Sequence, residues 1–121
     1  MVSVADTCAR VGDELTRVFA LLGKRWTGLI LAVLMPGPAH YAELRRAVPG
    51  ISERMLSSRL AELATAGLVT REVVDGPPLG VRYQVTPCGA ALRPAIEELA
   101  KWAHEHFATE PVGVSPVSSA D

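Results

Sequence analysis

The 121-residue sequence lacks most features that mark metal-binding, redox or membrane proteins. Its two cysteines, Cys8 and Cys88, are too far apart for a zinc site or a CxxC redox pair. No apolar run approaches the roughly 18 to 20 residues that a membrane span requires. The N-terminus also lacks the basic and apolar segments of a secretory signal. We therefore expect a cytoplasmic protein with no membrane partner, no cofactor and no resident metal.

A catalytic constellation is also missing. Cys8 and the three histidines, His40, His104 and His106, form no recognisable pairing of nucleophile and base, and no glycine-rich phosphate loop is present. His104 and His106 are two positions apart in an expected helix, so they point in different directions and cannot chelate one metal from regular helical geometry. The sequence favours a binding protein over an enzyme.

What is present favours one folded domain. The length suits a single core, and the composition, 49% hydrophobic and 21% charged, is ordinary for a folded protein. We place the domain at residues 1–108. Residues 109–121 are rich in proline, serine and valine without periodicity, and we expect a disordered tail there.

The net charge of -1 appears unsuited to nucleic acid, but the charges are segregated along the chain. Residues 24–82 carry eight basic and five acidic side chains, a net charge of +3, whereas residues 83–121 carry two and five, a net charge of -3. A locally basic segment is the electrostatic footprint expected of a DNA-binding element. The middle of the chain is therefore the candidate for DNA binding.

Hydrophobic periodicity and breaker residues predict a mainly helical fold with a small β-hairpin. Ser52 and Thr86 are expected helix N-caps, and Gly67 is placed to end a helix in a left-handed conformation. We expect Cys88 to be a packed small residue in the first turn of the last helix. The predicted helices are 10–22, 26–35, 41–48, 52–66 and 87–107, and the predicted strands are 68–74 and 81–85.

Two short helices joined by a tight turn and followed by a hairpin are the components of a winged helix-turn-helix. The second helix of the pair would be the recognition helix, because Leu56, Leu60 and Leu63 share one face and leave a polar face opposite. Arg54, near the end that usually enters the major groove, is the best candidate for a base contact. The expected DNA-binding residues on this helix are Ser52, Arg54, Ser57, Ser58 and Arg59.

Further DNA contacts are expected from the neighbouring elements. Tyr41, Arg45 and Arg46 lie on the positioning helix and are candidates for phosphate contacts. Arg82, near the hairpin tip, is a candidate for the minor groove or a phosphate.

Four motifs stand out along the chain: GKRW at 23–26, ELRRAVPGIS at 43–52, the ML..RL.EL..AGLV pattern at 55–69 and Y.VT..G at 83–89. Together they resemble the HxlR-type transcriptional regulators, which are related in fold to the MarR group. The resemblance covers about residues 8–107. It implies a bacterial regulator that binds an inverted-repeat operator as a homodimer, with its first and last helices forming the dimer interface.

The last predicted helix agrees with a dimer, since its apolar stripe exceeds what so small a core can cover. Two-fold symmetry would place the two recognition helices roughly 34 Å apart on one face of double-stranded DNA. The expected interface residues are Val11, Leu15, Leu99, Trp102 and Phe107.

The resemblance also directs attention to Cys8. HxlR-type proteins often have a cysteine just before the first helix, and in several members it responds to quinones, aldehydes or hypochlorite. A thiol near a helix N-terminus can have a lowered pKa and be more reactive. Cys8 is thus a candidate redox or electrophile sensor, although an inert interface cysteine would also fit this position.

Two further hypotheses stay open for the function as a whole. In one, the regulator responds to a small ligand held between the dimer-forming helices, and Cys8 is incidental. In the second, the winged helix serves only for protein interaction, which the weak overall charge would favour.

Overall fold

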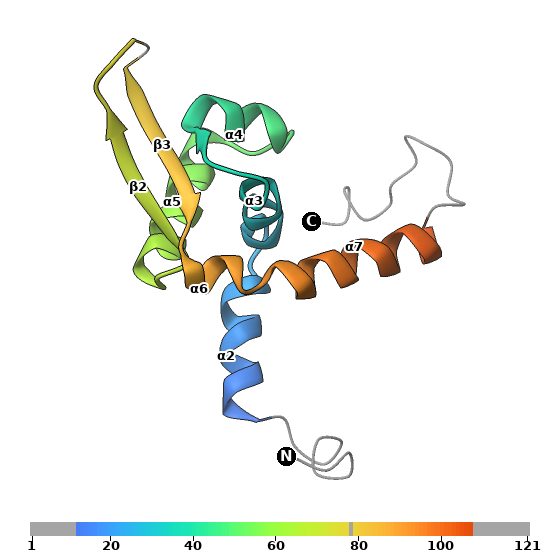
Figure 1. The fold of residues 1–121 in the computed structure, drawn as a ribbon. Helices are drawn as coiled ribbons and strands as arrows, with labels where there is room; N and C mark the ends of the chain where they lie inside the picture. The colour runs from blue at the N-terminus through green and yellow to red at the C-terminus, as the bar shows by residue number, and fades with distance from the viewer. Residues whose placement is uncertain (1–11, 78, 108–121) are drawn as a thin grey trace. The chain divides into compact units, whose positions relative to one another are not determined.

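The computed structural model describes residues 12–77 and 79–107, and its fold is mainly helical with a small antiparallel sheet (Figure 1). The helices are α2 (Asp13–Leu22), α3 (Thr27–Leu34), α4 (Tyr41–Ala47), α5 (Glu53–Thr65), α6 (Pro87–Ala90) and α7 (Arg93–Phe107). The strands are β1 (Ala39–His40), β2 (Val69–Val74) and β3 (Gly80–Val85). The order of α4, α5 and the β2–β3 hairpin is that of a winged helix-turn-helix, as the sequence predicts.

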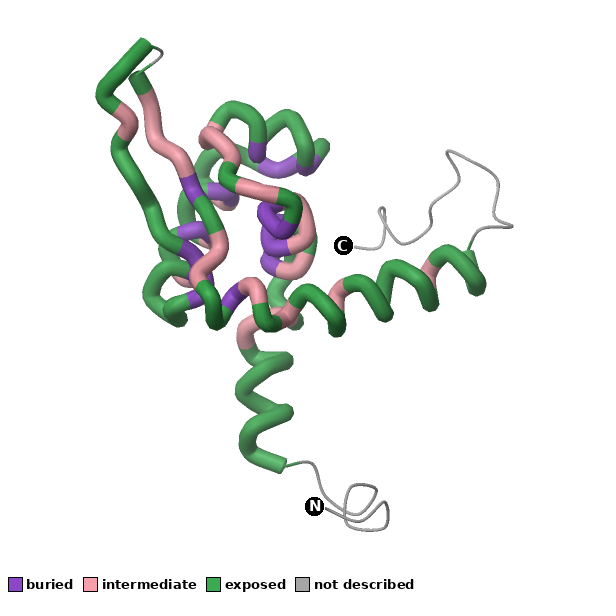
Figure 2. The backbone as a smooth tube through the Cα atoms, in the orientation of Figure 1, coloured by how far each residue is buried: buried purple, intermediate pink, exposed green. Residues whose placement is uncertain are grey.

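The core lies where α3, α4 and α5 meet the sheet, and the buried backbone segments gather there (Figure 2). Leu56, Leu60 and Leu63 are at most 1% exposed, which confirms the predicted inner face of α5. The apolar core residues are Ile30, Leu31, Leu34, Met35, Leu44, Val48, Ile51, Leu56, Leu60, Leu63, Leu68, Val69 and Tyr83.

The predicted turn chemistry around α5 is confirmed. The Ser52 hydroxyl accepts a hydrogen bond from the Met55 amide at 3.0 Å, so it satisfies one of the free N–H groups of the first turn. At the other end Gly67 has φ of +82°, the left-handed conformation that turns the chain from α5 into β2. These two residues fix where the expected recognition helix begins and ends.

The sheet has three strands in the order β1-β3-β2, one more than the predicted hairpin. Ala39 pairs with Tyr83 and His40 with Arg82, both antiparallel. β1 contains only two residues, too short for any alternation to be detected in the sequence. The extra strand β1 directly precedes α4 and pairs with β3, the middle strand of the sheet. The β2–β3 hairpin is called the wing below.

The prediction of one continuous helix over 87–107 is wrong. Helix α6 ends at Ala90 and α7 begins at Arg93. Pro94 explains the break, because it has no N–H to donate to the carbonyl four residues earlier and its ring clashes with that carbonyl. In the first turn of α7, however, the missing N–H costs nothing. Residues 12–91 and 92–107 belong to separate compact units and are described individually.

The first predicted helix also starts later than expected. Gly12 is extended and caps α2, which begins at Asp13. Cys8, Val11 and the tail at 109–121 lie outside the described residues. None of the described helices is both long and apolar enough to cross a membrane.

Candidate nucleic-acid interface

The outward face of α5 carries short polar side chains, as the helical wheel predicts. Arg54, Ser57, Ser58 and Ala61 are exposed, directly opposite the buried leucines. Arg54 makes no ion pair with another described residue, so its guanidinium is available to a ligand. A helix with small side chains can approach base edges closely, and an arginine near its N-terminal end can read guanine bidentately.

Two side-chain contacts connect α4 to the start of α5. The Tyr41 hydroxyl donates to the carbonyl of Glu53 at 3.0 Å and lies 3.0 Å from the Ser57 hydroxyl oxygen. Arg45 pairs with the Glu53 carboxylate at 2.7 Å. Tyr41, Ser57 and Arg45 are thus held in one cluster on the outer surface, close to the exposed Ser52 and the N-terminal turn of α5.

Arg59 differs from the other candidates because the fold holds it. Its Nε donates to the carbonyl of Arg25 at 2.9 Å, and its Nη1 lies 3.3 Å from Glu62, which also pairs with Lys24. The Arg59 side chain is only 15% exposed. These contacts tie the flank of α5 to the turn before α3, and they leave Arg59 less free than Arg54 to reach DNA.

In the wing, Arg82 and Glu72 are directly opposite each other on β3 and β2 and form an ion pair. The Arg82 Nε donates to Glu72 at 3.0 Å. The sequence predicts a DNA contact for Arg82, near the hairpin tip. Arg71, further along β2 from the tip, is also exposed and has no ion pair within the described residues. Arg71 shares a strand face with the buried Val69 and is directly opposite Tyr83 in the strand register, a pairing that the sequence pattern does not reveal.

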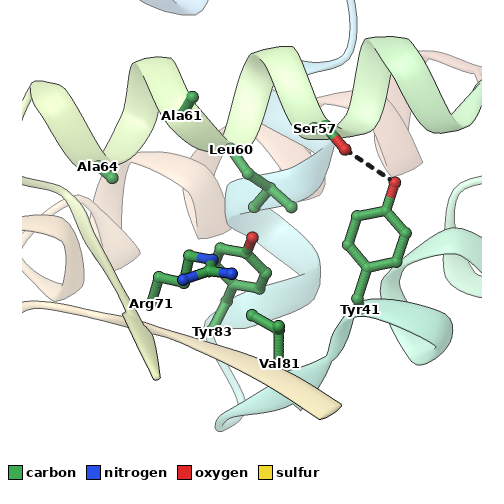
Figure 3. A pocket seen from close by; sticks show the side chains of 8 residues that line it. All are labelled: Tyr41, Ser57, Leu60, Ala61, Ala64, Arg71, Val81 and Tyr83. Carbon is green, nitrogen blue, oxygen red and sulfur yellow. Dashed lines mark hydrogen bonds between the residues drawn. The ribbon is translucent and has the colours of Figure 1, made fainter. Parts of the chain in front are cut away.

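A groove of about 480 Å³ lies between α5 and the wing (Figure 3). Tyr41 and Ser57 contribute hydroxyl groups to it and Arg71 contributes a guanidinium. The remaining lining residues are Leu60, Ala61, Ala64, Val81 and Tyr83, and the Tyr83 ring carries a third hydroxyl group. The groove opens on the same surface as the candidate DNA-binding residues Tyr41 and Ser57.

The expected dimer-forming helices expose apolar side chains. In α2, Leu15 is 46% exposed and Phe19 is 63% exposed. In α7, Leu99, Trp102 and Phe107 are each more than half exposed, and the Trp102 ring stacks on His106 and meets Phe107 edge-on. Large apolar side chains at this exposure favour a partner surface.

Cys88 is exposed, so the prediction that it packs in the first turn of α6 is wrong. The neighbouring Gly89 takes the buried position instead, because its Cα lies against the carbonyl of Leu68. Cys88 follows Pro87 on the outer side of this short helix.

The described residues contain no cluster of three or more histidine, cysteine, aspartate or glutamate side chains that could hold a metal. One of the described carboxyl groups has a clearly shifted pKa. The pKa of Glu43 is lowered, chiefly because its carboxylate accepts the backbone N–H of His40 at 2.7 Å, with further contributions from the His40 ring and Arg46. This bond caps α4 and helps position the helix that carries Tyr41 and Arg45.

Comparison with known proteins also indicates a helix-turn-helix protein. Residues 21–111 match the HxlR-like helix-turn-helix family. The chain is 41% identical over 92 residues to the HTH-type transcriptional regulator YodB of Bacillus subtilis, which covers 76% of this chain and 82% of YodB.

Solved structures agree with the sequence match. The reduced form of YodB from B. subtilis has a TM-score of 0.70 at 39% identity, covering 84% of this chain and 98% of that one. The redox regulator HypR in its oxidized form has a TM-score of 0.72 at 30% identity, covering 77% and 96%. A MarR-family protein from Porphyromonas gingivalis W83 has a TM-score of 0.74 at 34% identity, covering 80% and 98%. YodB also has quinone-bound and diamide-treated structures.

Proposed function

Because the chain belongs to the HxlR-like helix-turn-helix family of transcriptional regulators, we propose that it binds an inverted-repeat operator as a homodimer and represses transcription. The chain is a DNA-binding regulator and not an enzyme. The observation that carries the proposal is the outward face of α5, where Arg54, Ser57 and Ser58 stand exposed opposite a buried leucine face.

Each element has a role in the proposed complex. Helix α5 enters the major groove, with Arg54 reading a base and Ser57 and Ser58 contacting bases or phosphates. Arg82 on the wing reaches the adjacent minor groove or a phosphate. The remaining proposed phosphate contacts are Tyr41, Arg45, Arg46 and Ser52.

The dimer is proposed to form through the two terminal helices. These helices expose large apolar side chains in the single protomer, which favours their burial against a partner. They include Leu15, Leu99, Trp102 and Phe107. Two-fold symmetry then matches the two halves of the operator. Substituting Trp102 by Glu is expected to yield a monomer by sedimentation and to weaken operator binding, whereas an unchanged dimer would contradict this interface.

Operator binding is tested with DNA from upstream of the chain's own gene, titrated at several salt concentrations. The affinity is expected to fall steeply with salt and to exceed that for scrambled DNA, because several phosphates are neutralised on binding. Arg54→Ala is expected to lower operator affinity by about 1 to 3 kcal/mol, the usual value of a bidentate base contact. Arg17→Ala, which removes a charge from α2, is the matched control. Equal affinity for operator and scrambled DNA would favour a winged helix used for protein interaction.

Regulation through Cys8 is the second part of the proposal. The relatives support it, since YodB has reduced, quinone-bound and diamide-treated structures and HypR is a redox regulator. We propose that oxidation or alkylation of Cys8 changes the spacing of the two recognition helices and releases DNA.

Cys88 supplies the matched control, because it is exposed and also a thiol. Diamide or a quinone is expected to release operator DNA from the wild type and from Cys88→Ser, but not from Cys8→Ser. Release from the Cys8→Ser variant would contradict the thiol switch at Cys8, and release by the quinone alone, without release by diamide, would favour a regulator that responds to a reversibly bound ligand.

A further inference from the structure

The turn between α2 and α3, residues 23–26, is held by two side chains of α5. The Arg59 Nε donates to the Arg25 carbonyl at 2.9 Å. The Glu62 carboxylate accepts a hydrogen bond from the Lys24 Nζ at 3.2 Å, and it lies 3.3 Å from the Arg59 Nη1. Arg59 is therefore connected to the turn twice, directly through a backbone carbonyl and indirectly through Glu62. We call Lys24, Arg59 and Glu62 the α5 clamp.

Arg59 is suited to restrain a turn because of its shape and its burial. A guanidinium presents five N–H donors in a planar fork, so one side chain can bond a carbonyl and a carboxylate at the same time. The Arg59 side chain is 15% exposed and that of Glu62 is 33% exposed, so salt screens this pair less than a fully exposed one. The geometry favours a side chain that holds the fold in place over one that reaches toward DNA.

Trp26 attaches the same turn to the segment between α4 and α5. Its backbone has φ of +82°, in the left-handed region that a bulky residue rarely adopts. A Cβ at Gly50 would lie 3.7 Å from the outer edge of the Trp26 ring, and the ring lines a shallow hollow with Val48 and Pro49. The turn is thus in contact with α5 and with the residues that lead into α5.

Helix α2 depends on this turn for its place in the domain. Every residue of α2 is at least partly exposed, and Leu15, Val18 and Phe19 are each more than two-fifths exposed. At its end the Gly23 amide donates to the Phe19 carbonyl at 2.9 Å, so the helix continues directly into the turn. The position of α2 is therefore passed to α5 through residues 23–26.

We propose that Arg59 is a positioning residue that fixes α5 relative to α2 and thereby sets the half-site spacing that the dimer accepts. The proposal rests on the proposed function, in which α2 lies at the dimer interface and each α5 reads one half-site. With α2 held against the partner, the clamp keeps the two recognition helices at one separation. Arg59 acts through the turn and does not itself contact DNA.

The spacing role is tested by titrating two operators, the native one and one with a base pair inserted between its half-sites. The insertion moves the half-sites apart by roughly 3.4 Å and rotates them by roughly 35°. Arg59→Met is expected to bind the native operator about tenfold or more weakly than the wild type, because α5 is no longer preorganised. It is expected to bind the lengthened operator about threefold or more tightly, because a released α5 can adjust to the new spacing.

The opposite signs separate positioning from other roles of Arg59. A lost DNA contact or a destabilised domain weakens binding to both operators. Arg46→Met, which removes a proposed phosphate contact on α4, is the comparison and is expected to weaken both and to lower the salt slope by about one unit. Arg59→Met is expected to leave that slope unchanged. Weaker binding of Arg59→Met to the lengthened operator, or a slope lowered as in Arg46→Met, would overturn the proposal.

Two milder variants keep the test valid if Arg59→Met unfolds or dissociates, which sedimentation detects. Glu62→Gln removes the ion pairs but leaves the bond from Arg59 to the Arg25 carbonyl, so it is expected to change both affinities in the same directions by smaller factors. Arg59→Lys keeps the charge without the planar fork and is expected to lie between the wild type and Arg59→Met. Wild-type behaviour of Arg59→Lys would mean that charge alone matters and would contradict the clamp.

Amide hydrogen exchange on the full chain without DNA separates the clamp from the proposed function. The amides of Lys24 and Thr27 bond to carbonyls of Leu21 and Lys24 at 3.4 and 3.3 Å. Arg59→Met is expected to speed exchange at both by about tenfold or more and to leave the β2–β3 ladder unchanged. Unchanged exchange at Lys24 and Thr27 would overturn the clamp.

The two measurements together show which proposal fails. If exchange rises while no DNA is bound specifically, the restraint on the turn is supported and the proposed function is wrong. If the operator is bound specifically but Arg59→Met gains no affinity for the lengthened one, the spacing role is wrong and the proposed function is retained.

Discussion

The hydroxyl groups of Tyr41 and Ser57 lie 3.0 Å apart and connect the positioning helix α4 to the outward face of α5. The Tyr41 hydroxyl also donates to the Glu53 carbonyl in the first turn of α5. Because its proton is used in that bond, its oxygen is left to accept the Ser57 hydroxyl. One side chain thus links the two helices and holds the hydroxyl of a candidate DNA contact.

Tyr41→Phe is expected to destabilise the domain by about 1 to 2 kcal/mol, because it removes two hydrogen bonds between helices. Urea denaturation measures the loss. Tyr83→Phe is the matched control, since the Tyr83 hydroxyl has no hydrogen bond to another described residue. If the two variants lose the same stability, the Tyr41 bonds do not support the helix-turn-helix.

Glu72 is expected to weaken the proposed contact between Arg82 and DNA, because its carboxylate pairs with the Arg82 guanidinium across strands β2 and β3. Glu72→Gln frees the guanidinium and is expected to raise operator affinity by roughly 1.5- to 5-fold, the value of an exposed ion pair. The slope of log affinity against log salt should steepen by about one unit, as for one additional phosphate contact. Salt-dependent operator titrations measure both quantities.

Glu98→Gln changes the net charge equally but lies on α7, so it controls for charge alone. A Glu72→Gln variant that behaves like Glu98→Gln would mean that Arg82 does not contact DNA.

The winged helix-turn-helix is predictable from the sequence because its local signals are strong. Leucines at helical spacing, the Ser52 cap and Gly67 each follow from a rule that acts within a few residues. Strand β1 is not predictable in this way, because two residues carry no periodicity and its pairing with β3 is a tertiary contact. The break between α6 and α7 is a different case. Pro94 signals the break in the sequence, but the apolar stripe over 87–107 favours one continuous helix, and that prediction is wrong.

In the candidate site, too, some features are predictable from the sequence and others are not. The exposed face of α5 is predictable, because periodicity decides which side of a helix is buried. The ion pairs of Arg45 and Arg82 and the hydrogen bonds that hold Arg59 are not, because each depends on where another element places a glutamate or a carbonyl. Arg71 escapes prediction because only the register with Tyr83 places it in the groove.

Gly67, which follows α5, and Gly89, which lies within α6, are expected to resist substitution for different reasons. Gly67 has φ of +82° and open space around it, so Gly67→Ala should cost about 1 to 2 kcal/mol from backbone strain alone. A Cβ at Gly89 would lie 2.2 Å from the Leu68 carbonyl oxygen, a backbone atom that cannot move aside. Gly89→Ala should therefore cost more, about 3 kcal/mol or above.

Thermal or urea unfolding ranks the two glycine variants. Gly67→Asn offers a further check, since asparagine tolerates the left-handed region better than alanine and should recover part of the loss. A Gly89→Ala variant as stable as the wild type would show that α6 does not approach the Leu68 carbonyl as closely as the structure indicates.

The Glu43 carboxylate is expected to make stability depend on pH in the acid range. Its pKa is lowered below the ordinary value of 4.5, mainly by the hydrogen bond from the backbone N–H of His40. The folded state therefore holds the ionised form more strongly than the unfolded chain does. The resulting stabilisation is fully present above pH 4.5 and is lost as the pH falls through the lowered pKa of the folded state.

Glu43→Gln keeps an acceptor for the His40 N–H but cannot ionise. The variant is expected to be less stable than the wild type at pH 7, and the difference should shrink as the pH falls below 4.5, because protonated Glu43 then resembles glutamine. Urea denaturation of both proteins between pH 7 and pH 3 measures the difference. Glu98→Gln serves as the control, since no hydrogen bond from a described residue reaches that carboxylate. A wild-type and Glu43→Gln difference that stays constant down to pH 3 would mean that the α4 cap does not depend on the charge of Glu43.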